Sequence, residues 1–248
     1  MDANQSDRLV IALRAAALEL VTRRSIDDLE ATLAQIVLTA VETVPGVDAG
    51  SISMTRNGVV ETRHPTTDEI GELDRTQGEL YEGPCITALS DPADDGVVLA
   101  QDLAGQDASR WPKFAPQAVA FGFLSLMSTQ LCAAPSMRAA LNLYSRAPHA
   151  FDEQARRVAG LFGVQAGVLL YGSDRATHLK HAVDTRDVIG QAKGILMARF
   201  AIDDDQAFRM LVSSSQETNI KLVDVSRWVA SEAAQGRHQP TDPARRNR

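Results

Sequence analysis

The sequence has few cysteines and no long apolar run. Its 248 residues include two cysteines, Cys85 and Cys132, and neither belongs to a CxxC pair or has a histidine at zinc-ligand spacing. We therefore expect two reduced thiols. No stretch of about 18 apolar residues occurs, and the chain does not start with a charged segment followed by an apolar one. These absences predict a cytoplasmic protein that neither spans a membrane nor is exported.

Sequence motifs of catalysis are absent as well. The chain contains no GxGxxG, P-loop, GxSxG or HExxH pattern. His178 and His181 could share a helix face as metal ligands, but such a pair is more often solvent-facing. We therefore expect no enzymatic activity, no cofactor and no metal site. An enzyme acting through a pocket in the N-terminal part would need titratable groups that converge there, and the sequence offers few.

Charge is distributed unevenly along the chain, whose formal net charge is -7. Residues 1–172 carry 13 Lys and Arg against 22 Asp and Glu, a net charge of -9, whereas residues 173–248 carry 12 against 10, a net charge of +2. This balance argues against a protein that coats nucleic acid through a broad basic surface. A polyanion would instead contact a local patch in the C-terminal part.

Apolar spacing and turn residues predict an α+β fold in the first two thirds of the chain. An Asn-Gly step at Asn57 and Gly58 favours a tight hairpin turn. Helices are expected to flank an antiparallel sheet, with helices at 7–21, 25–43, 67–80 and 112–121, strands at 49–55, 59–62, 97–102, 123–131 and 138–146, and a loop at 82–85.

A long helix is predicted to follow the sheet from residue 152 to 171. One of its faces carries Val158, Leu161, Phe162, Gln165, Val168 and Leu169. Weaker apolar spacing at Leu179, Ala182 and Val183 indicates that the linker stays helical, as a signalling helix or coiled-coil seam would. We therefore expect an N-terminal domain over 1–172, a linker over 173–184, a helical domain over 185–234 and a disordered tail over 235–248.

Three short helices are predicted between residues 185 and 234. Asp203 and Gln206 form a capping-box pair at the start of the second helix, and Asn219 interrupts it. Their apolar faces can close only on one another, which predicts a small bundle. The residues on these faces are Ile189, Ala192, Leu196 and Phe200, then Ala207, Phe208, Leu211 and Val212, then Leu222, Val225, Ser226 and Val229.

The bundle resembles the ANTAR family. The resemblance is carried by Arg186-Asp187-Val188-Ile189-Gly190-Gln191-Ala192-Lys193-Gly194-Ile195-Leu196-Met197, by Asp205-Gln206-Ala207-Phe208, by Ser213-Ser214-Ser215-Gln216 and by Asn219–Val225. Proteins of that family bind paired RNA hairpins in nascent transcripts and prevent a terminator from forming, so the resemblance implies an antiterminator that binds structured RNA. Ser226 and Ala201 depart from the common Ala and Gly, and neither departure removes a charge.

One face of the first bundle helix is suited to RNA. Arg186, Gly190, Lys193 and Met197 follow at i, i+4, i+7 and i+11, so two cations lie beside a residue without a side chain. Cations contact phosphate, and glycine lets a backbone approach closely. The predicted RNA-binding set is Arg186, Gly190, Lys193, Gly194 and Arg199, with ordinary solvated helix charges as the alternative. The acidic run at 203–205 is interpreted as a helix cap and not as a metal site.

The N-terminal part resembles a GAF domain of the kind that precedes ANTAR domains in actinobacteria. Matching stretches span roughly Ser25 to Gly172: Glu82-Gly83-Pro84-Cys85 with Ala88, Asp102-Leu103, Arg110-Trp111-Pro112, Ser125-Leu126-Met127-Ser128 and Ala140-Leu141-Asn142-Leu143-Tyr144-Ser145. GAF domains are sensors whose pocket between sheet and connecting helices holds a small molecule, a chromophore or a cofactor, or is closed. The resemblance therefore implies a sensor domain.

The candidate ligand-pocket residues are Cys85, Trp111, Phe114, Ser125 and Asn142. Cys85 is either redox-active, a covalent attachment point or an inert packing residue. Trp111 and Phe114 either line a pocket or belong to the core. The NKFDE signature of cyclic-nucleotide GAF domains is not intact, because Asn142 is followed by Leu143 and only the segment 151–153 matches its end.

These observations predict a homodimeric transcription regulator in which a GAF domain sets the orientation of RNA-binding ANTAR bundles. Dimerisation is inferred from the apolar helices at 9–20 and 158–169, which carry more apolar surface than one small sheet covers. The alternative is a ligand-sensing module whose bundle docks on a protein partner. The two hypotheses differ in the salt dependence of binding, which is steep for RNA.

Overall fold

The computed structural model describes residues 29–56, 59–92, 94–134 and 137–236. The chain divides into two compact units, 1–173 and 174–248, which are described separately. The helix predicted over 7–21, the predicted turn at Asn57 and Gly58, and the tail beyond residue 236 lie outside the described residues.

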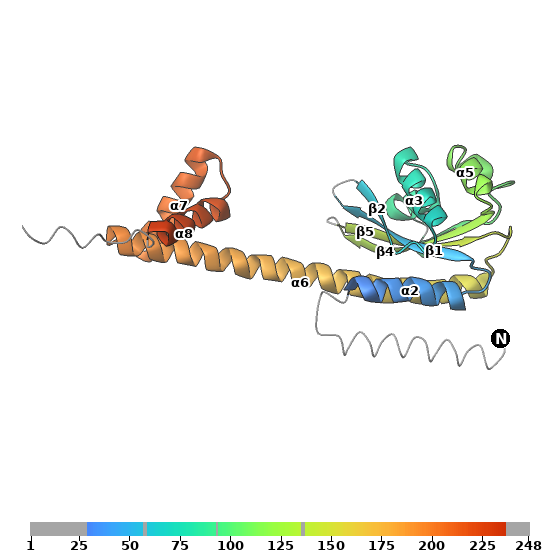
Figure 1. Ribbon diagram of the computed structural model, residues 1–248, viewed down its shortest axis with the longest axis horizontal. Coiled ribbons are helices and arrows are strands. Elements are labelled where there is room, and N and C mark those ends of the chain that lie inside the picture. Colours follow the sequence, from blue (N-terminus) through green and yellow to red (C-terminus); the bar gives the residue numbers. More distant parts are fainter. Residues whose placement is uncertain (1–28, 57–58, 93, 135–136, 237–248) are drawn as a thin grey trace, which may run out of the picture. The chain divides into compact units, whose positions relative to one another are not determined.

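The N-terminal unit is built around a five-stranded antiparallel sheet with the order β2-β1-β5-β4-β3 (Figure 1). Strand β1 lies between β2, its neighbour in the chain, and β5, its distant partner. A register shift between Gln130 and Cys132 marks a β-bulge in β4. The predicted antiparallel sheet is confirmed, with strands β1 (Ala49–Arg56), β2 (Val59–Arg63), β3 (Val97–Ala100), β4 (Ser125–Ala134) and β5 (Met137–Ser145).

Helices cover both faces of this sheet, so the unit has three layers. Helix α2 (Leu29–Thr43) and the first part of α6 (Glu153–Phe200) pack on one face, where Leu33, Ile52 and Phe162 share one apolar cluster. Helices α3 (Asp68–Leu80), α4 (Pro84–Ser90) and α5 (Phe114–Ala120) contribute to a second cluster on the other face (Figure 1). The inward residues of both sheet faces are thereby removed from water.

Helix α4 corrects the sequence prediction, which treated residues 82–85 as a loop. Gly83 precedes the helix with a φ of 135°, and a Cβ there would lie 2.3 Å from Gln77 Oε1, so the position requires glycine. Pro84 occupies the first helical turn, where a backbone N–H is not needed. The Gly-Pro pair therefore starts a helix, and Cys85 is buried in its first turn.

The face of α6 that packs on the sheet differs from the predicted face. Val158 and Phe162 are buried as expected, but Leu161 is 41% exposed and Val168 is 61% exposed. The buried face is continued mostly by small residues, namely Ala155, Ala159, Ala166 and Leu170. This part of α6 has apolar residues on several sides, so spacing alone could not identify all the residues that face the sheet.

The C-terminal unit packs the end of α6 against two 15-residue helices, α7 (Asp204–Thr218) and α8 (Leu222–Gly236). The predicted capping box is confirmed, because the Asp203 carboxylate accepts from Gln206 N–H at 2.7 Å and the Gln206 side chain accepts from Asp203 N–H at 3.2 Å. Asn219, with a φ of 54°, ends α7 as predicted. The buried core consists of Ala192, Leu196, Ala207, Leu211 and Val225.

Two glycines let α6 lie directly against β4. A Cβ on Gly163 would lie 2.8 Å from Thr129 Cγ2, and a Cβ on Gly167 would lie 2.3 Å from the carbonyl oxygen of Leu131. The second contact involves backbone, which cannot turn aside as a side chain does. Gly167 therefore fixes how closely α6 approaches the strand.

We predict that Gly167→Ala lowers the free energy of unfolding by about 1–3 kcal/mol, because the added methyl group overpacks the helix against the strand. The measurement is urea unfolding. Gly160→Ala on the same helix is the matched control, since a Cβ there meets no atom within 4 Å. This control should raise stability by up to about 1 kcal/mol through helix propensity. Equal effects of the two substitutions would contradict the close contact.

Candidate functional site

An open groove in the C-terminal unit brings together three of the predicted RNA-binding residues, Arg186, Gly190 and Lys193. Its volume is about 600 Å³. Most of the groove wall comes from the last part of α6, and α7 adds an aromatic ring. The lining residues are Ala182, Thr185, Arg186, Asp187, Ile189, Gly190, Gln191, Lys193 and Phe208.

The environment of Phe208 differs from the one that the sequence predicted. The sequence placed it in the bundle core together with Phe200, but the two rings are 41% and 52% exposed. The apolar period of α7 did not distinguish the buried Ala207 and Leu211 from Phe208, which lines the groove. An exposed aromatic ring beside cations is a surface on which a nucleobase can stack.

Lys193 already has a partner within the protein. Its Nζ atom lies 2.6 Å from Oδ1 and 2.7 Å from Oδ2 of Asp204, the first residue of α7. The same ammonium lies 5.9 Å from the centre of the Phe208 ring. The ion pair depends on how α6 and α7 pack, so the sequence pattern could place Lys193 on the groove face but could not show its neutralising carboxylate.

Gly190 and Gly194 are exposed, and a Cβ built on either residue would meet no atom within 4 Å. Both lie inside α6, where glycine is less favourable than alanine by about 0.5–1 kcal/mol. Within the part of the chain that the structure describes, no neighbouring atom therefore requires glycine at these two positions. This distinguishes them from Gly163 and Gly167, which the sheet requires.

Arg199 does not join the groove. It is exposed and lies 13 residues beyond Arg186, which on a helix of 3.6 residues per turn is about 220° further around the axis. The structure thus assembles four of the five predicted positions on neighbouring parts of α6, with Arg186, Gly190 and Lys193 lining the groove and Gly194 one residue beyond it.

The candidate pocket residue Asn142 belongs to a buried polar cluster in the N-terminal unit. Its Nδ2 atom donates to Ser53 Oγ at 2.9 Å and to Asp74 Oδ1 at 3.1 Å, and its Oδ1 atom accepts from Ser128 Oγ at 2.9 Å. All four residues are fully buried. The cluster joins the middle of the sheet to helix α3.

Asp74 is at the centre of this cluster, and the sequence analysis missed it. Ser51 Oγ and Tyr144 OH each donate to its carboxylate at 2.5 Å. Burial raises the pKa of Asp74 to about 6, although the hydrogen bonds from Ser51, Tyr144 and Asn142 oppose the shift. The available signal was the spacing of Asp74 and Gln77 with Ile70 and Leu73, which places two polar residues on the buried face of α3.

Gln77 connects Tyr144, a hydrogen-bond partner of Asp74, to Cys85. Its Nε2 atom donates to Tyr144 OH at 3.0 Å, and its Oε1 atom accepts from the backbone N–H of Cys85 at 2.9 Å. Burial, followed by the nearby Asp74 charge, raises the pKa of the Cys85 thiol to about 12. A thiol that stays protonated is a poor nucleophile, so this environment favours the packing interpretation of Cys85.

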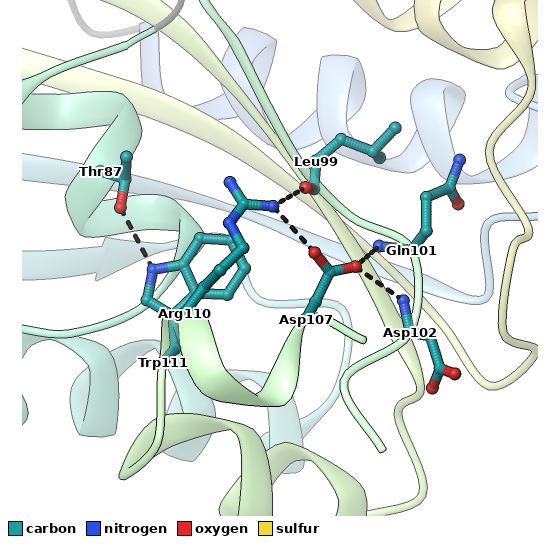
Figure 2. A network of polar contacts seen from close by, with 7 residues as sticks. All are labelled: Thr87, Leu99, Gln101, Asp102, Asp107, Arg110 and Trp111. Atoms are coloured by element: carbon teal, nitrogen blue, oxygen red, sulfur yellow. Dashed lines mark hydrogen bonds and ion pairs between the residues drawn. The ribbon is translucent and has the colours of Figure 1, made fainter. Parts of the chain in front are cut away.

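Trp111 takes part in a separate network that ties a loop to β3 (Figure 2). Its Nε1 atom donates to Thr87 Oγ1 at 3.2 Å, and the Arg110 guanidinium lies 4.2 Å from its ring centre. Arg110 also donates to the Leu99 carbonyl oxygen at 2.8 Å and to Asp107 Oδ1 at 2.9 Å. These contacts give Trp111 a structural role in the second apolar cluster, to which Phe114 also belongs.

Asp107 anchors the same loop through its other oxygen. Its Oδ2 atom accepts from the backbone N–H groups of Gln101 at 2.7 Å and Asp102 at 3.0 Å (Figure 2). Burial opposes ionisation, but these hydrogen bonds and Arg110 hold the pKa of Asp107 below its ordinary value. The remaining candidate, Ser125, donates to the Ala147 carbonyl oxygen at 2.8 Å. Of the five candidate pocket residues, the structure therefore brings only Cys85 and Asn142 to the Asp74 cluster.

Comparison with known proteins finds similarities for both units. Residues 177–229 match the family model of the ANTAR domain. The GAF domain of a protein described as a sensor histidine kinase from Pseudomonas syringae pv. tomato is 16% identical, with a TM-score of 0.50, and the similarity covers 73% of this chain and 96% of that one. No curated protein matches the chain.

A second solved structure has the same fold. The chromophore-binding domain of an unusual bacteriophytochrome from R. palustris is 10% identical, with a TM-score of 0.50 over 71% of this chain, which spans 64% of that domain. At these identities the similarity shows the fold. The N-terminal unit therefore has the same fold as these domains, and residues 177–229 of the C-terminal unit match the ANTAR domain. Both findings support the GAF plus ANTAR architecture that the sequence predicted.

None of the helices over the described ranges combines the length and apolarity needed to cross a bilayer. Among those same residues, no three His, Cys, Asp or Glu side chains gather in a way that could hold a metal ion.

The raised pKa of Asp74 predicts how stability varies with pH. Well below pH 4 the carboxyl is protonated in both the folded and the unfolded chain. As the pH rises towards 6 only the unfolded chain ionises, so the folded state loses about 3 kcal/mol relative to a chain without this group. The loss is complete above the folded pKa of about 6.

The measurement is the free energy of unfolding of the wild type minus that of Asp74→Asn, taken from urea titrations between about pH 4 and pH 7.5. Subtraction cancels the other titrating groups. We expect this difference to fall by about 2–3 kcal/mol over this range as the pH rises. A difference that stays constant or increases would show that Asp74 is not a carboxyl with a raised pKa.

Proposed function

We propose that this protein is a cytoplasmic, non-enzymatic transcription regulator that binds structured RNA through its ANTAR domain and acts as an antiterminator. The proposed partner is hairpin RNA in nascent transcripts. The GAF domain would supply the signal, with a small molecule as the class of ligand. The family match at residues 177–229 supports the RNA-binding part of this proposal.

The observation that carries the proposal is the pair of helix glycines at Gly190 and Gly194 beside the cations Arg186 and Lys193 on one side of α6. Each of the two glycines destabilises α6 relative to alanine, and among the residues that the structure describes no neighbouring atom needs the space. A ligand that approaches the helix backbone closely would need it. Arg186 and Lys193 lie on the same face, so the expected ligand is polyanionic.

The charge of the domain indicates how such a ligand is held. Residues 173–248 have a net charge of only +2, so long-range attraction contributes little and a few local contacts must supply the affinity. Structured RNA presents phosphates at defined positions and unpaired loop bases that stack on aromatic rings. The groove offers cations, open backbone and the Phe208 ring for these three kinds of contact.

We predict that Gly190→Ala separates stability from binding. The variant should unfold at a higher urea concentration, by about 0.5–1 kcal/mol, because alanine favours the helix. Its affinity for RNA should fall by about 1 kcal/mol or more, because the methyl group occupies the space into which the RNA backbone fits. The probe is a pool of synthetic RNAs with two adjacent hairpins and randomised loops, measured by filter binding.

Gly172→Ala is the matched control, since Gly172 is also a glycine of α6 with no atom within 4 Å of its Cβ position, but it lies in the N-terminal unit. It should raise stability without changing RNA affinity. Wild-type affinity that does not decrease with salt would favour a protein partner over RNA. Unchanged binding by Gly190→Ala would place the interface on another face.

We also propose that the protein is a homodimer. Leu161, Val164 and Val168 of α6 follow at i, i+3 and i+7, the spacing of a coiled-coil seam, and are 41%, 67% and 61% exposed. A stripe of apolar side chains in contact with water is stabilised when a second copy covers it. This supports dimerisation through the part of α6 that lies in the GAF unit.

The double substitution Val164→Glu and Val168→Glu should therefore produce a monomer at concentrations at which the wild type sediments as a dimer, because two desolvated carboxylates at the seam are strongly unfavourable. Val59→Glu is the control, since Val59 is 62% exposed on β2, outside the stripe. A wild-type protein that sediments as a monomer would contradict the proposal, as would a double variant that remains dimeric.

A further inference from the structure

The ion pair between Lys193 and Asp204 conflicts with a role of Lys193 in binding RNA. The ammonium is held by both carboxylate oxygens, at 2.6 and 2.7 Å, and its side chain is only 22% exposed. A phosphate can bind this ammonium only in competition with Asp204. We propose that Asp204 is a built-in competitor of RNA, displaced from Lys193 on binding, which sets the affinity and the salt dependence of the groove; this rests on the function proposed above.

The strength of the pair makes such an exchange feasible. The Asp204 side chain is 63% exposed, so water and salt screen its attraction for the lysine. Exposed pairs of this kind stabilise a folded protein only weakly. A phosphate anion can therefore replace the carboxylate without a large loss, whereas a buried pair would hold the lysine permanently.

Lys193 is in position before the exchange takes place. Its ammonium stays 5.9 Å from the Phe208 ring centre at the groove wall, so the exchange needs no large movement of the lysine. Asp204, by contrast, is at the first position of α7, where its side chain is free of the capping box formed by Asp203 and Gln206. Release of Asp204 from Lys193 would thus leave the cap of α7 intact.

The surrounding charges give Asp204 a second reason to be retained. Asp203, Asp204 and Asp205 lie at the N-terminus of α7, where negative charge stabilises a helix. The same charges repel a polyanion from the neighbouring groove. The groove is also lined by Asp187, which repels a polyanion, and by Arg186, which attracts it. Helix stability and RNA affinity therefore make opposite demands on Asp204.

A matched pair of substitutions isolates the contact from the charge. Asp204→Asn and Asp205→Asn each remove one carboxylate from the first turn of α7, and only Asp204 is bonded to Lys193. With the full-length protein and the two-hairpin RNA pool, Asp204→Asn should bind about two- to fivefold more tightly than Asp205→Asn, the range that an exposed ion pair allows. In the background of Lys193→Met this difference should disappear.

Salt provides the readout that a structural role of Asp204 would not change. Without the Asp204 carboxylate, Lys193 is neutralised by a salt ion, which RNA releases when it binds. The plot of log affinity against log salt concentration should therefore be steeper for Asp204→Asn than for Asp205→Asn, by nearly one unit of slope. Thermal unfolding checks that each variant folds. Asp204→Ser replaces Asp204→Asn if that variant does not fold.

Three outcomes would overturn the inference. Equal affinity and equal salt slope for the two asparagine variants would mean that Asp204 does not compete with RNA. Weaker binding by Asp204→Asn would mean that the pair presents Lys193 to RNA instead of withholding it. Absence of salt-sensitive binding by the wild type would overturn the proposed function itself, and is recognised before any variant is compared.

Discussion

The packing of α6 is the constraint on which both units depend. In the N-terminal unit its small residues and Gly167 place the helix against the backbone of β4, where a single methyl group would meet a carbonyl oxygen 2.3 Å away. In the C-terminal unit Ala192 and Leu196 of the same helix supply the surface on which α7 and α8 form a core. Neither of these two helices is long enough to be stable alone in water.

The glycines of α6 therefore differ in the physical reason for their presence. Gly163 and Gly167 are required by contacts inside the protein, whereas Gly190 and Gly194 have no such contact. Among the described residues Gly160 and Gly172 have equally open Cβ positions, so an open glycine alone does not mark a binding site. Gly190 and Gly194 differ from them because Arg186 and Lys193 lie on the same side of the helix. This combination of open backbone and cationic side chains is the basis for proposing a binding role for the groove.

The GAF unit shows the opposite situation, because its candidate ligand residues are used internally. Asn142 and Cys85 are engaged by Asp74 and Gln77, and Trp111 by Thr87 and Arg110. Burying a carboxylate is unfavourable unless hydrogen bonds offset the loss of hydration. Ser51, Asn142 and Tyr144 provide them, so the polar interior between the sheet and α3 is a satisfied network.

Much of this architecture could be predicted from the sequence, since strand alternation, the capping box at Asp203 and the turn at Asn219 are local signals. Helix α4 was missed because Gly83 and Pro84 also indicate a loop, and only the contact of Gly83 with Gln77 shows which applies. The exposure of Leu161 and Val168 could not be predicted because apolar residues occur on several sides of α6.

The candidate sites divide in the same way. Helical spacing predicted correctly that Arg186, Gly190 and Lys193 share one side of α6, since this depends on one helix alone. The partners of Lys193 and Asn142 come from other elements, namely Asp204 of α7 and Asp74 of α3, so no local pattern contains them. Phe208 was assigned to the core because only the packed bundle distinguishes it from its neighbour Ala207.

The central claim is that the groove of the ANTAR domain binds structured RNA. Its most direct test is ultraviolet crosslinking of the full-length protein to RNA in cells that express it, with sequencing of the RNA and mass spectrometry of the crosslinked peptides. The account predicts enriched transcripts with adjacent hairpins and crosslinks within residues 182–194 and at Phe208. Recovery of no enriched RNA, or crosslinks confined to residues 29–173, would contradict it.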